Sequence, residues 1–390
     1  MSTQPRAAPL LDVDALIDNP HTEVLVTCGS GGVGKTTAAA AIALRAAERG
    51  RCVVVLTIDP ARRLAQSLGL DQLSNEPHEV LGIKGTGRLF AMMLDMKRTF
   101  DDVVTAHSTP ERAEQIFANP FYQSLSSSFA GTQEYMAMEK LSQLRESMQT
   151  DRANAPWDLI VVDTPPSRSA LDFLDAPNRL GRFLDGRMIR LISAPARAGG
   201  RAYVKVISAS FSLFTRVLTK ILGSELIRDV ASFVSAMETM FGGFRERADQ
   251  TYQLLKADDT AFLVVAAPEP DALREASFFV ERLSAEEMPL GGLILNRVHE
   301  VPAPLSGRAA EAALERLEAG PDDAPLAAAA LRVHVVGSDA AAADNRMARR
   351  FAAAHPSVPT ARVAALPGDV HDLTGLRTVG TLLAKRPKSA

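Results

Sequence analysis

The chain has 390 residues, enough for two or three structural units that share a core. Lys and Arg total 43 against 46 Asp and Glu, so the chain lacks the basic excess of a protein that coats nucleic acid. Hydrophobic residues make up 46% and charged residues 23%, which is the composition of a globular protein and excludes a disordered chain.

The two cysteines, Cys28 and Cys52, are too few for a disulfide framework or for a Cys-based zinc or iron–sulfur site within one chain. We expect both to pack in or beside core strands. The N-terminus lacks the basic region and apolar stretch of a secretory signal. The longest uncharged run, Gln115 to Gln133, is too rich in Ser and Gln to cross a membrane. We therefore expect a soluble, cytoplasmic protein.

Short, almost continuous apolar runs recur along the chain and alternate with helical patterns. The runs are Glu23–Cys28, Cys52–Ile58, Trp157–Val162, Ala261–Ala267, Leu290–Leu295 and Arg362–Leu366. Helical patterns between them include Lys35–Arg49 and Asp271–Leu283. Strands covered on both faces read as continuous apolar runs, and their alternation with helices indicates parallel pairing. The sequence predicts an α/β fold with a doubly wound, mostly parallel sheet.

Two stretches do not follow this alternation. Residues 101–150 and 171–255 are helical in period, so we predict that they form an inserted α-helical subdomain. Residues 1–100, 151–170 and 256–390 then make the α/β domain. The tract from Ser306 to Ala330 is rich in Ala and acids and contains Gly-Pro, which favours a surface helix followed by a linker.

The second helical stretch contains a basic region. Between Arg179 and Asp229, ten Arg or Lys residues outnumber three acids. One helical face there is apolar, formed by Ile207, Phe211, Phe214, Leu218 and Ile221. This face is either part of the subdomain's own core or a groove for an apolar helical client, and the basic charge is either solvated or turned toward an anionic membrane surface.

One motif carries specific chemistry. Between the first predicted strand and the helix after it stand Gly29, Ser30, Gly31, Gly32, Val33, Gly34, Lys35, Thr36 and Thr37. They fit the phosphate-loop pattern G-x-x-x-x-G-K-[ST] in its required strand-to-helix context. Glycines let backbone N–H groups surround a phosphate, Lys35 reaches the β- and γ-phosphates, and the Thr36 hydroxyl is a ligand for Mg²⁺.

Two aspartates follow predicted buried strands. Asp59 follows the second strand, and Asp163 follows the third. In open parallel sheets ligands bind at the carboxyl ends of strands, so both side chains should lie beside the phosphate loop. Asp163 is suited to hold Mg²⁺ directly or through water, and Asp59 to orient or deprotonate an attacking water.

Together these residues resemble the arsenical-pump ATPase family, which includes ATPases that target tail-anchored membrane proteins. The resemblance rests on the Gly-Gly-Val-Gly-Lys-Thr-Thr core, Asp59-Pro60-Ala61 and Asp163-Thr164-Pro165-Pro166, and spans nearly the whole chain. The family belongs to the MinD-related, dimer-forming class of phosphate-loop ATPases. The sequence is most similar to actinobacterial anion-transporting members, which occur as pairs of related but non-identical subunits.

The resemblance implies roles for individual residues. Asp59 matches the switch I aspartate that positions the hydrolytic water, and Asp163 begins switch II. Asn296, with Arg297 beside it, matches the family's adenine-reading position after a strand. Pro367 falls where a C-terminal loop packs on adenine.

Two departures from the family pattern bear on function. The family's loop usually has a lysine at its second position, which reaches the partner's nucleotide across the dimer, whereas this chain has Ser30. The metalloid-binding cysteines of arsenite pumps have no counterparts, and no C-x-x-C pair is present to bridge a dimer through zinc. Arsenite transport is therefore disfavoured, and a partner that keeps its lysine would complete this chain's site.

The resemblance implies a cytoplasmic Mg²⁺-dependent ATPase that hydrolyses ATP to ADP and phosphate, in which nucleotide state switches a dimer to capture and release a cargo. One alternative is a weakly hydrolytic ATP-binding subunit of a heterodimer with a related, lysine-bearing ATPase. Another is a positioning ATPase like MinD or ParA. We expect no nucleic-acid partner, while the helical subdomain offers a site for an apolar client or for peripheral contact with the inner face of a membrane.

Overall fold

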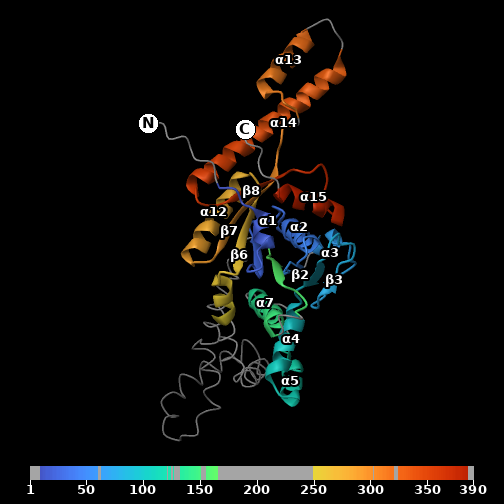
Figure 1. Cartoon of the computed structure of the whole chain (residues 1–390), viewed down its shortest axis with the longest axis vertical. Coiled ribbons are helices and arrows are strands. Elements are labelled where there is room, and N and C mark those ends of the chain that lie inside the picture. Colours follow the sequence, from blue (N-terminus) through green and yellow to red (C-terminus); the bar gives the residue numbers. More distant parts are fainter. Residues whose placement is uncertain are drawn as a thin grey trace, which may run out of the picture. The chain divides into compact units, whose positions relative to one another are not determined.

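The computed structural model describes residues 9–59, 63–120, 122, 123, 126, 132–150, 155–165, 249–301, 303–319 and 324–384 (Figure 1). The chain divides into two compact units. The first comprises Met1–Met93, Ser147–Leu171 and Leu255–Ala390, and the second Leu94–Glu146 and Asp172–Leu254. The basic region from Arg179 to Asp229, with its apolar face, lies outside the described residues, so its interpretation stays a prediction.

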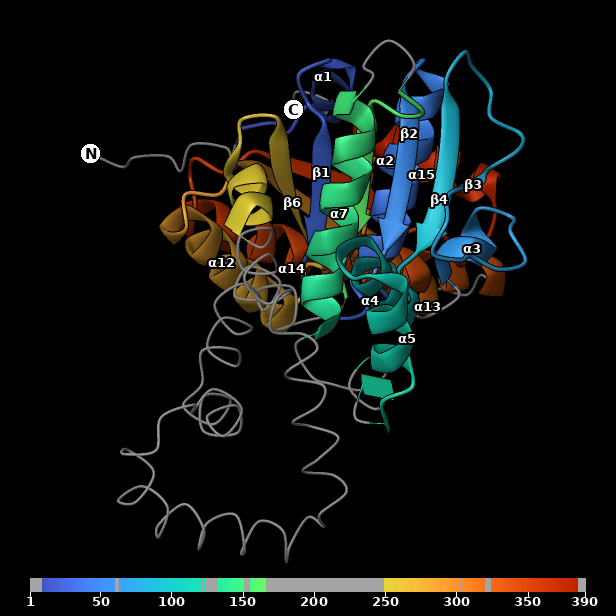
Figure 2. The same ribbon diagram turned by 90° about the horizontal axis from the view of Figure 1, so that it is seen from below.

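An eight-stranded sheet forms the centre of the first unit. The strands are β1 (Val24–Cys28), β2 (Cys52–Thr57), β3 (His78–Glu79), β4 (Arg88–Met93), β5 (Leu159–Asp163), β6 (Thr260–Ala266), β7 (Leu290–Val298) and β8 (Thr360–Ala364). Their order is β3-β4-β2-β5-β1-β6-β7-β8, and every pairing is parallel except that of β3 with β4. Figure 2 shows β6, β1, β2 and β4 in this order across the sheet, with β5 paired between β1 and β2. The predicted fold class is confirmed.

Strands β3 and β4 were not predicted from the sequence. Strand β4 consists largely of Leu, Ala, Phe and Met, of which Ala has low strand propensity and Met is as common in helices. The two residues of β3 are exposed and polar. Neither segment has the β-branched apolar run by which the central strands were recognised.

Seven named helices belong to the first unit. They are α1 (Val13–Asp18), α2 (Lys35–Glu48), α3 (Arg63–Ser67), α12 (Pro270–Ala285), α13 (Gly307–Ala319), α14 (Pro325–Ala354) and α15 (Leu373–Ala384). Helix α2 has ten buried residues out of fourteen, seven of them alanines. It packs against the sheet and against α15, and only small side chains allow such close approach on two sides. The Arg377 guanidinium of α15 fixes this packing by donating to Glu48 Oε1 at 2.7 Å.

The connection from β7 to β8 is an α-helical hairpin. Helix α13 packs along α14, and the two lie antiparallel and side by side (Figure 1). The expectation of a linker after the first helix was wrong, because α14 begins at Pro325 and continues for 30 residues. Proline suits a first helical turn, and the alanines that follow are the strongest helix formers. By length and composition alone α14 could cross a membrane: its most apolar 18 residues have a mean hydropathy of 1.2, with 17% of that stretch buried.

The second unit, described by itself, contains α4 (Met96–His107), α5 (Pro110–Phe117) and most of α7 (Thr132–Thr150). Its best-described contact centres on the fully buried side chain of Tyr122. The ring packs on Phe100 and Phe117, and the hydroxyl donates to Asp101 Oδ1 at 2.5 Å. Burial, reinforced by this hydrogen bond, raises the pKa of Tyr122. The phenol therefore holds these helices together as a neutral group.

Candidate nucleotide site

The phosphate loop turns between β1 and α2, and glycine is required at both of its ends. Gly29 has φ of +145°, and a Cβ there would lie 2.1 Å from the carbonyl oxygen of Val265 on β6. Gly34 has φ of +95°, and a Cβ there would lie 2.3 Å from Asn296 Nδ2. Side-chain-bearing residues rarely adopt such φ values, and neither position has room for one. The loop's glycines thus meet a steric demand of this particular packing.

Lys35 is the first residue of α2, and its side chain folds back over the loop. Its Nζ donates to the carbonyl oxygen of Ser30 at 2.9 Å. Burial lowers the pKa of Lys35, while the nearby Asp163 carboxylate acts in the opposite direction. The neighbouring thiol of Cys28 is fully buried, and this burial raises its pKa to about 12, so it is an inert core group.

Asp163 ends β5 and receives two threonine hydroxyls. Its Oδ2 accepts a hydrogen bond from Thr36 Oγ1 at 2.8 Å and from Thr57 Oγ1 at 2.9 Å. Its Oδ1 is buried and has no hydrogen-bond partner among the residues that the structure describes. Burial raises the pKa of Asp163 to about 6, although both threonine donors and Lys35 favour the charged form.

Thr57 is a site residue that the sequence analysis missed. It ends β2, and it lies opposite Asp163 in the parallel register of β2 with β5. Besides donating to Asp163, its oxygen accepts a hydrogen bond from the backbone N–H of Asp59 at 3.2 Å. The segment leading to Asp59 is therefore tied to Asp163 through one hydroxyl group. Pro60 and Ala61, which follow Asp59 in the motif, lie outside the described residues.

The residues expected near adenine differ in where they lie. Asn296 comes to the phosphate loop, where its Nδ2 donates to the carbonyl oxygen of Val33 at 2.8 Å. The next residue, Arg297, has φ of +58°, where the β7–β8 register shifts, and its side chain is exposed. Pro367 is exposed in the segment after β8. Within the described part of the chain, no hydrogen bond joins Arg297 or Pro367 to the loop.

Comparison with known sequences decides the family. A sequence model described as "Anion-transporting ATPase" matches residues 22–304, which include the phosphate loop, Asp59, Asp163 and Asn296. The chain belongs to the anion-transporting ATPase family. It is an ATPase by this membership, and the family resemblance predicted from the motifs is confirmed. The match ends before α13, so the α13–α14 hairpin lies outside it.

Individual relatives agree with this placement. The chain is 23% identical over 288 residues to "ATPase GET3" of Podospora anserina, covering 73% of this chain and 76% of the relative. It is 26% identical over 284 residues to "ATPase GET3C" of Arabidopsis thaliana, covering 69% and 65%. With "ATPase ASNA1 homolog" of Cryptosporidium parvum it shares 26% over 270 residues, covering 69% and 63%. For the last two, the matched part is just under two thirds of the relative's length.

The oxygen atoms of the site suit a magnesium ion. Mg²⁺ takes oxygen ligands, binds through one or two carboxylates and keeps several waters. The buried, unpartnered Oδ1 of Asp163 beside the Thr36 hydroxyl offers such oxygens. No cluster of three or more His, Cys, Asp or Glu side chains that could hold a metal alone occurs among the described residues. The chain therefore provides a partial shell of the kind that nucleotide phosphates complete.

Proposed function

We propose that this ATPase binds ATP with Mg²⁺ in its phosphate loop and uses hydrolysis to switch a dimer between cargo-bound and cargo-free states. The observation that supports the catalytic part is the convergence of Thr36 and Thr57 on Asp163, whose second oxygen is buried and unpartnered. An isolated buried carboxylate costs free energy, so an unused oxygen at this position favours a ligand that the described residues do not supply.

In this proposal the loop and Lys35 hold the phosphates. The backbone N–H groups of the loop and the N-terminus of α2 favour an anion, and no side-chain cap competes for them at Gly34. Lys35 exchanges the Ser30 carbonyl for phosphate oxygens, which are stronger acceptors because they are charged. The Thr36 hydroxyl and Asp163 would hold Mg²⁺, which neutralises charge on the β- and γ-phosphates.

Asp59 would position the attacking water. Its carboxylate can accept a proton or a hydrogen bond from that water, which displaces ADP from the γ-phosphorus atom. The link from the Asp59 backbone through Thr57 to Asp163 connects this residue with the magnesium ligand. A change at the γ-phosphate is thereby transmitted to the segment after β2, as expected of a switch.

Steady-state ATP hydrolysis by the purified chain, with its mass measured with and without nucleotide, tests the proposal. We expect Asp59→Asn to abolish hydrolysis while ATP still binds, because the amide is a much weaker base. Asp158→Asn, the same change just before β5 and therefore at the opposite end of that strand from Asp163, serves as a matched control. Equal rates for wild type and Asp59→Asn would contradict the role of Asp59.

The serine at position 30 supports a second candidate, an ATP-binding subunit that needs a lysine-bearing partner. The Ser30 side chain is short and uncharged, and its carbonyl receives this chain's own Lys35. If the homodimer lacks a cross-subunit charge, Ser30→Lys should raise both hydrolysis and nucleotide-dependent dimerisation. If wild type is already fully active and Ser30→Lys changes nothing, the chain is sufficient by itself.

A further inference from the structure

Exposed apolar side chains gather on and just before the α13–α14 hairpin. Eight large hydrophobic side chains are exposed among the described residues, and five of them lie between positions 301 and 336, two before α13 and three on α14. On α14 these are Leu326, Val333 and Val336, with exposed fractions of 83%, 72% and 69%. Monomeric proteins rarely leave such side chains clustered, because burying each is worth about 1.5–3 kcal/mol. This apolar surface therefore favours burial by a binding partner.

The exposed residues form one continuous stripe on α14. At 3.6 residues per turn, Leu326, Val333 and Val336 fall within an arc of about 80°. The neighbouring positions, on this arc or within about 40° of its edge, are small: Ala329, Ala330, Gly337 and Ala340. We call these seven residues the α14 stripe. Its spacing of three and four residues is the heptad pattern by which one helix packs on another, and its small residues permit close approach.

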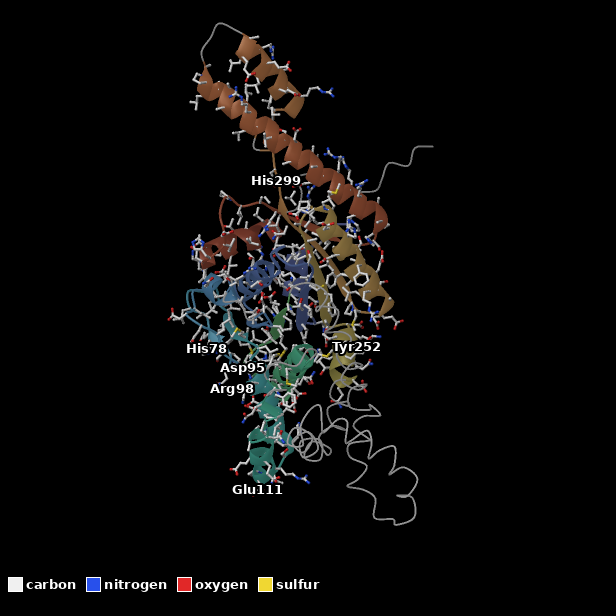
Figure 3. All side chains as sticks on the ribbon, turned by 180° about the vertical axis from the view of Figure 1, so that it is seen from behind. His78, Asp95, Arg98, Glu111, Tyr252 and His299 are labelled. Atoms are coloured by element: carbon white, nitrogen blue, oxygen red, sulfur yellow. The ribbon has the colours of Figure 1, made fainter. Side chains whose placement is uncertain are left out.

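Other positions of α14 are already fixed by contacts within the first unit. There His334 Nε2 donates to the Leu305 carbonyl at 2.8 Å, and Ala328 and Ala341 are buried. Further along, Asp344 Oδ2 accepts the backbone N–H of His299 at 2.7 Å and lies 2.9 Å from His299 Nδ1 (Figure 3). A membrane-spanning α14 would have to break these contacts, so the stripe is better matched to a protein helix.

Two charges beside the stripe indicate which helix that is. Arg332 and Asp339 lie seven residues apart on the same flank. When two copies of α14 pack antiparallel with Val333 of one opposite Val336 of the other, Arg332 of each copy comes to Asp339 of its partner. Arg332 already pairs with Glu318 at 2.5 Å, but its side chain is 59% exposed and has donors for a second carboxylate. Asp339 forms no ion pair within the described chain.

We propose that the α14 stripe is a homotypic docking surface on which two copies of this chain pair through antiparallel α14 helices. The stripe is about 21 Å long and lies on a single helix, so it buries less area than the about 800 Å² per partner of a standard interface. We therefore expect weak association, in the micromolar range. Pairing through α14 does not require ATP, because no residue of the nucleotide site takes part. This inference is therefore tested independently of the proposed function.

Sedimentation velocity of the full chain without nucleotide, over a micromolar concentration series, tests the proposal. We expect a monomer–dimer equilibrium that Val333→Asp abolishes, since the new carboxylate would be buried at the centre of the stripe. Val335→Ala, on the half-buried flank facing away from the stripe, is the control and should keep the dimer. A wild-type chain that stays monomeric, or a Val333→Asp variant that still dimerises, would overturn the proposal.

Charge reversal tests the antiparallel register. Arg332→Asp places Asp opposite Asp, and Asp339→Arg places Arg opposite Arg, so each should weaken the dimer about tenfold. The double variant Arg332→Asp with Asp339→Arg restores both pairs and should restore wild-type affinity. Failure of this rescue would refute pairing between two copies. Binding of wild-type monomer to anionic lipid vesicles, lost in Val333→Asp, would instead assign the stripe to a membrane surface.

Discussion

The nucleotide site and the α13–α14 hairpin belong to the same unit and use opposite physical means to recognise a ligand. At the site, polar atoms converge in a buried setting, and one carboxylate oxygen is left over. On the hairpin, apolar side chains are left exposed beside two opposite charges on one flank. The first arrangement selects a small, charged ligand by exact positions of donors and acceptors. The second selects a helix by periodicity, which tolerates a shift of an ångström and therefore gives weaker binding.

The largest expected effect is the loss of ATP hydrolysis when the positive charge of Lys35 is removed from the nucleotide site. Lys35→Ala deletes the group that reaches the phosphates, and we expect hydrolysis to fall at least about 100-fold. Sedimentation without nucleotide should be unchanged, because α14 is untouched. Circular dichroism checks that the α2 helix is retained. A parallel loss of dimer and activity would contradict the independence of the two regions.

Adding a methyl group to the phosphate loop at Gly34 should lower ATP binding almost as strongly. Gly34→Ala forces a left-handed residue and brings its Cβ to 2.3 Å from Asn296 Nδ2, so we expect weakened ATP binding and a free energy of unfolding lower by about 1–3 kcal/mol. Equilibrium dialysis and urea unfolding measure the two effects. Combining the change with Asn296→Ala removes the clash but keeps the φ penalty, so rescue should be partial. Gly69→Ala, at φ of +71° with open space around it, is the matched control for φ alone.

Thr57 offers a finer test of the polar convergence. Thr57→Val keeps the shape of the side chain but leaves Asp163 with one donor and frees the Asp59 backbone, so we expect kcat to fall about tenfold with little change in ATP affinity. Thr57→Ser should restore most of the rate. The Mg²⁺ dependence of nucleotide binding gives a second readout, since Asp163 would be less well oriented. Equal loss in the Ser and Val variants would show that packing, not the hydroxyl, matters.

The smallest effect should come from a half-buried ion pair between α1 and α2. Arg45 donates to both carboxylate oxygens of Asp14, at 2.5 and 2.7 Å, and this hydrogen bonding holds the pKa of Asp14 below its usual value. Its stabilising contribution is complete above the usual pKa of 3.8 and is lost as the pH falls through the lower folded value. Arg45→Gln should therefore lower the free energy of unfolding by no more than about 1 kcal/mol at neutral pH, and the difference should vanish in acid.

The parts of the molecule that were predictable from sequence share a strong local signal. The core strands at Cys52–Thr57 and Leu159–Asp163 are continuous apolar runs, and the loop from Gly29 to Thr37 has a fixed order of residue types. Thr57 was missed because a threonine at the end of a strand reads as a strand former, and its role depends on register with a strand about 100 residues later.

The α14 helix was missed for a different reason. The alanines between its few large apolar residues give little hydrophobic contrast, and the Gly-Pro just before it favoured a linker over the start of a new helix. Asn296 shows the same limit at the site. Its contact with Val33 joins residues 263 positions apart, and only the parallel arrangement of β1, β6 and β7 brings them together.

The alanines of α2 determine where this ATPase can deform. Alanine has no rotamers, so a helix that is buried through alanines on two sides has one way to pack and no side-chain rearrangement with which to absorb a displacement. Helix α2 should therefore stay rigid when a phosphate binds or is released. The displacement is instead taken up by the backbone around the phosphate site, where the loop glycines precede α2 and Asp59 follows β2.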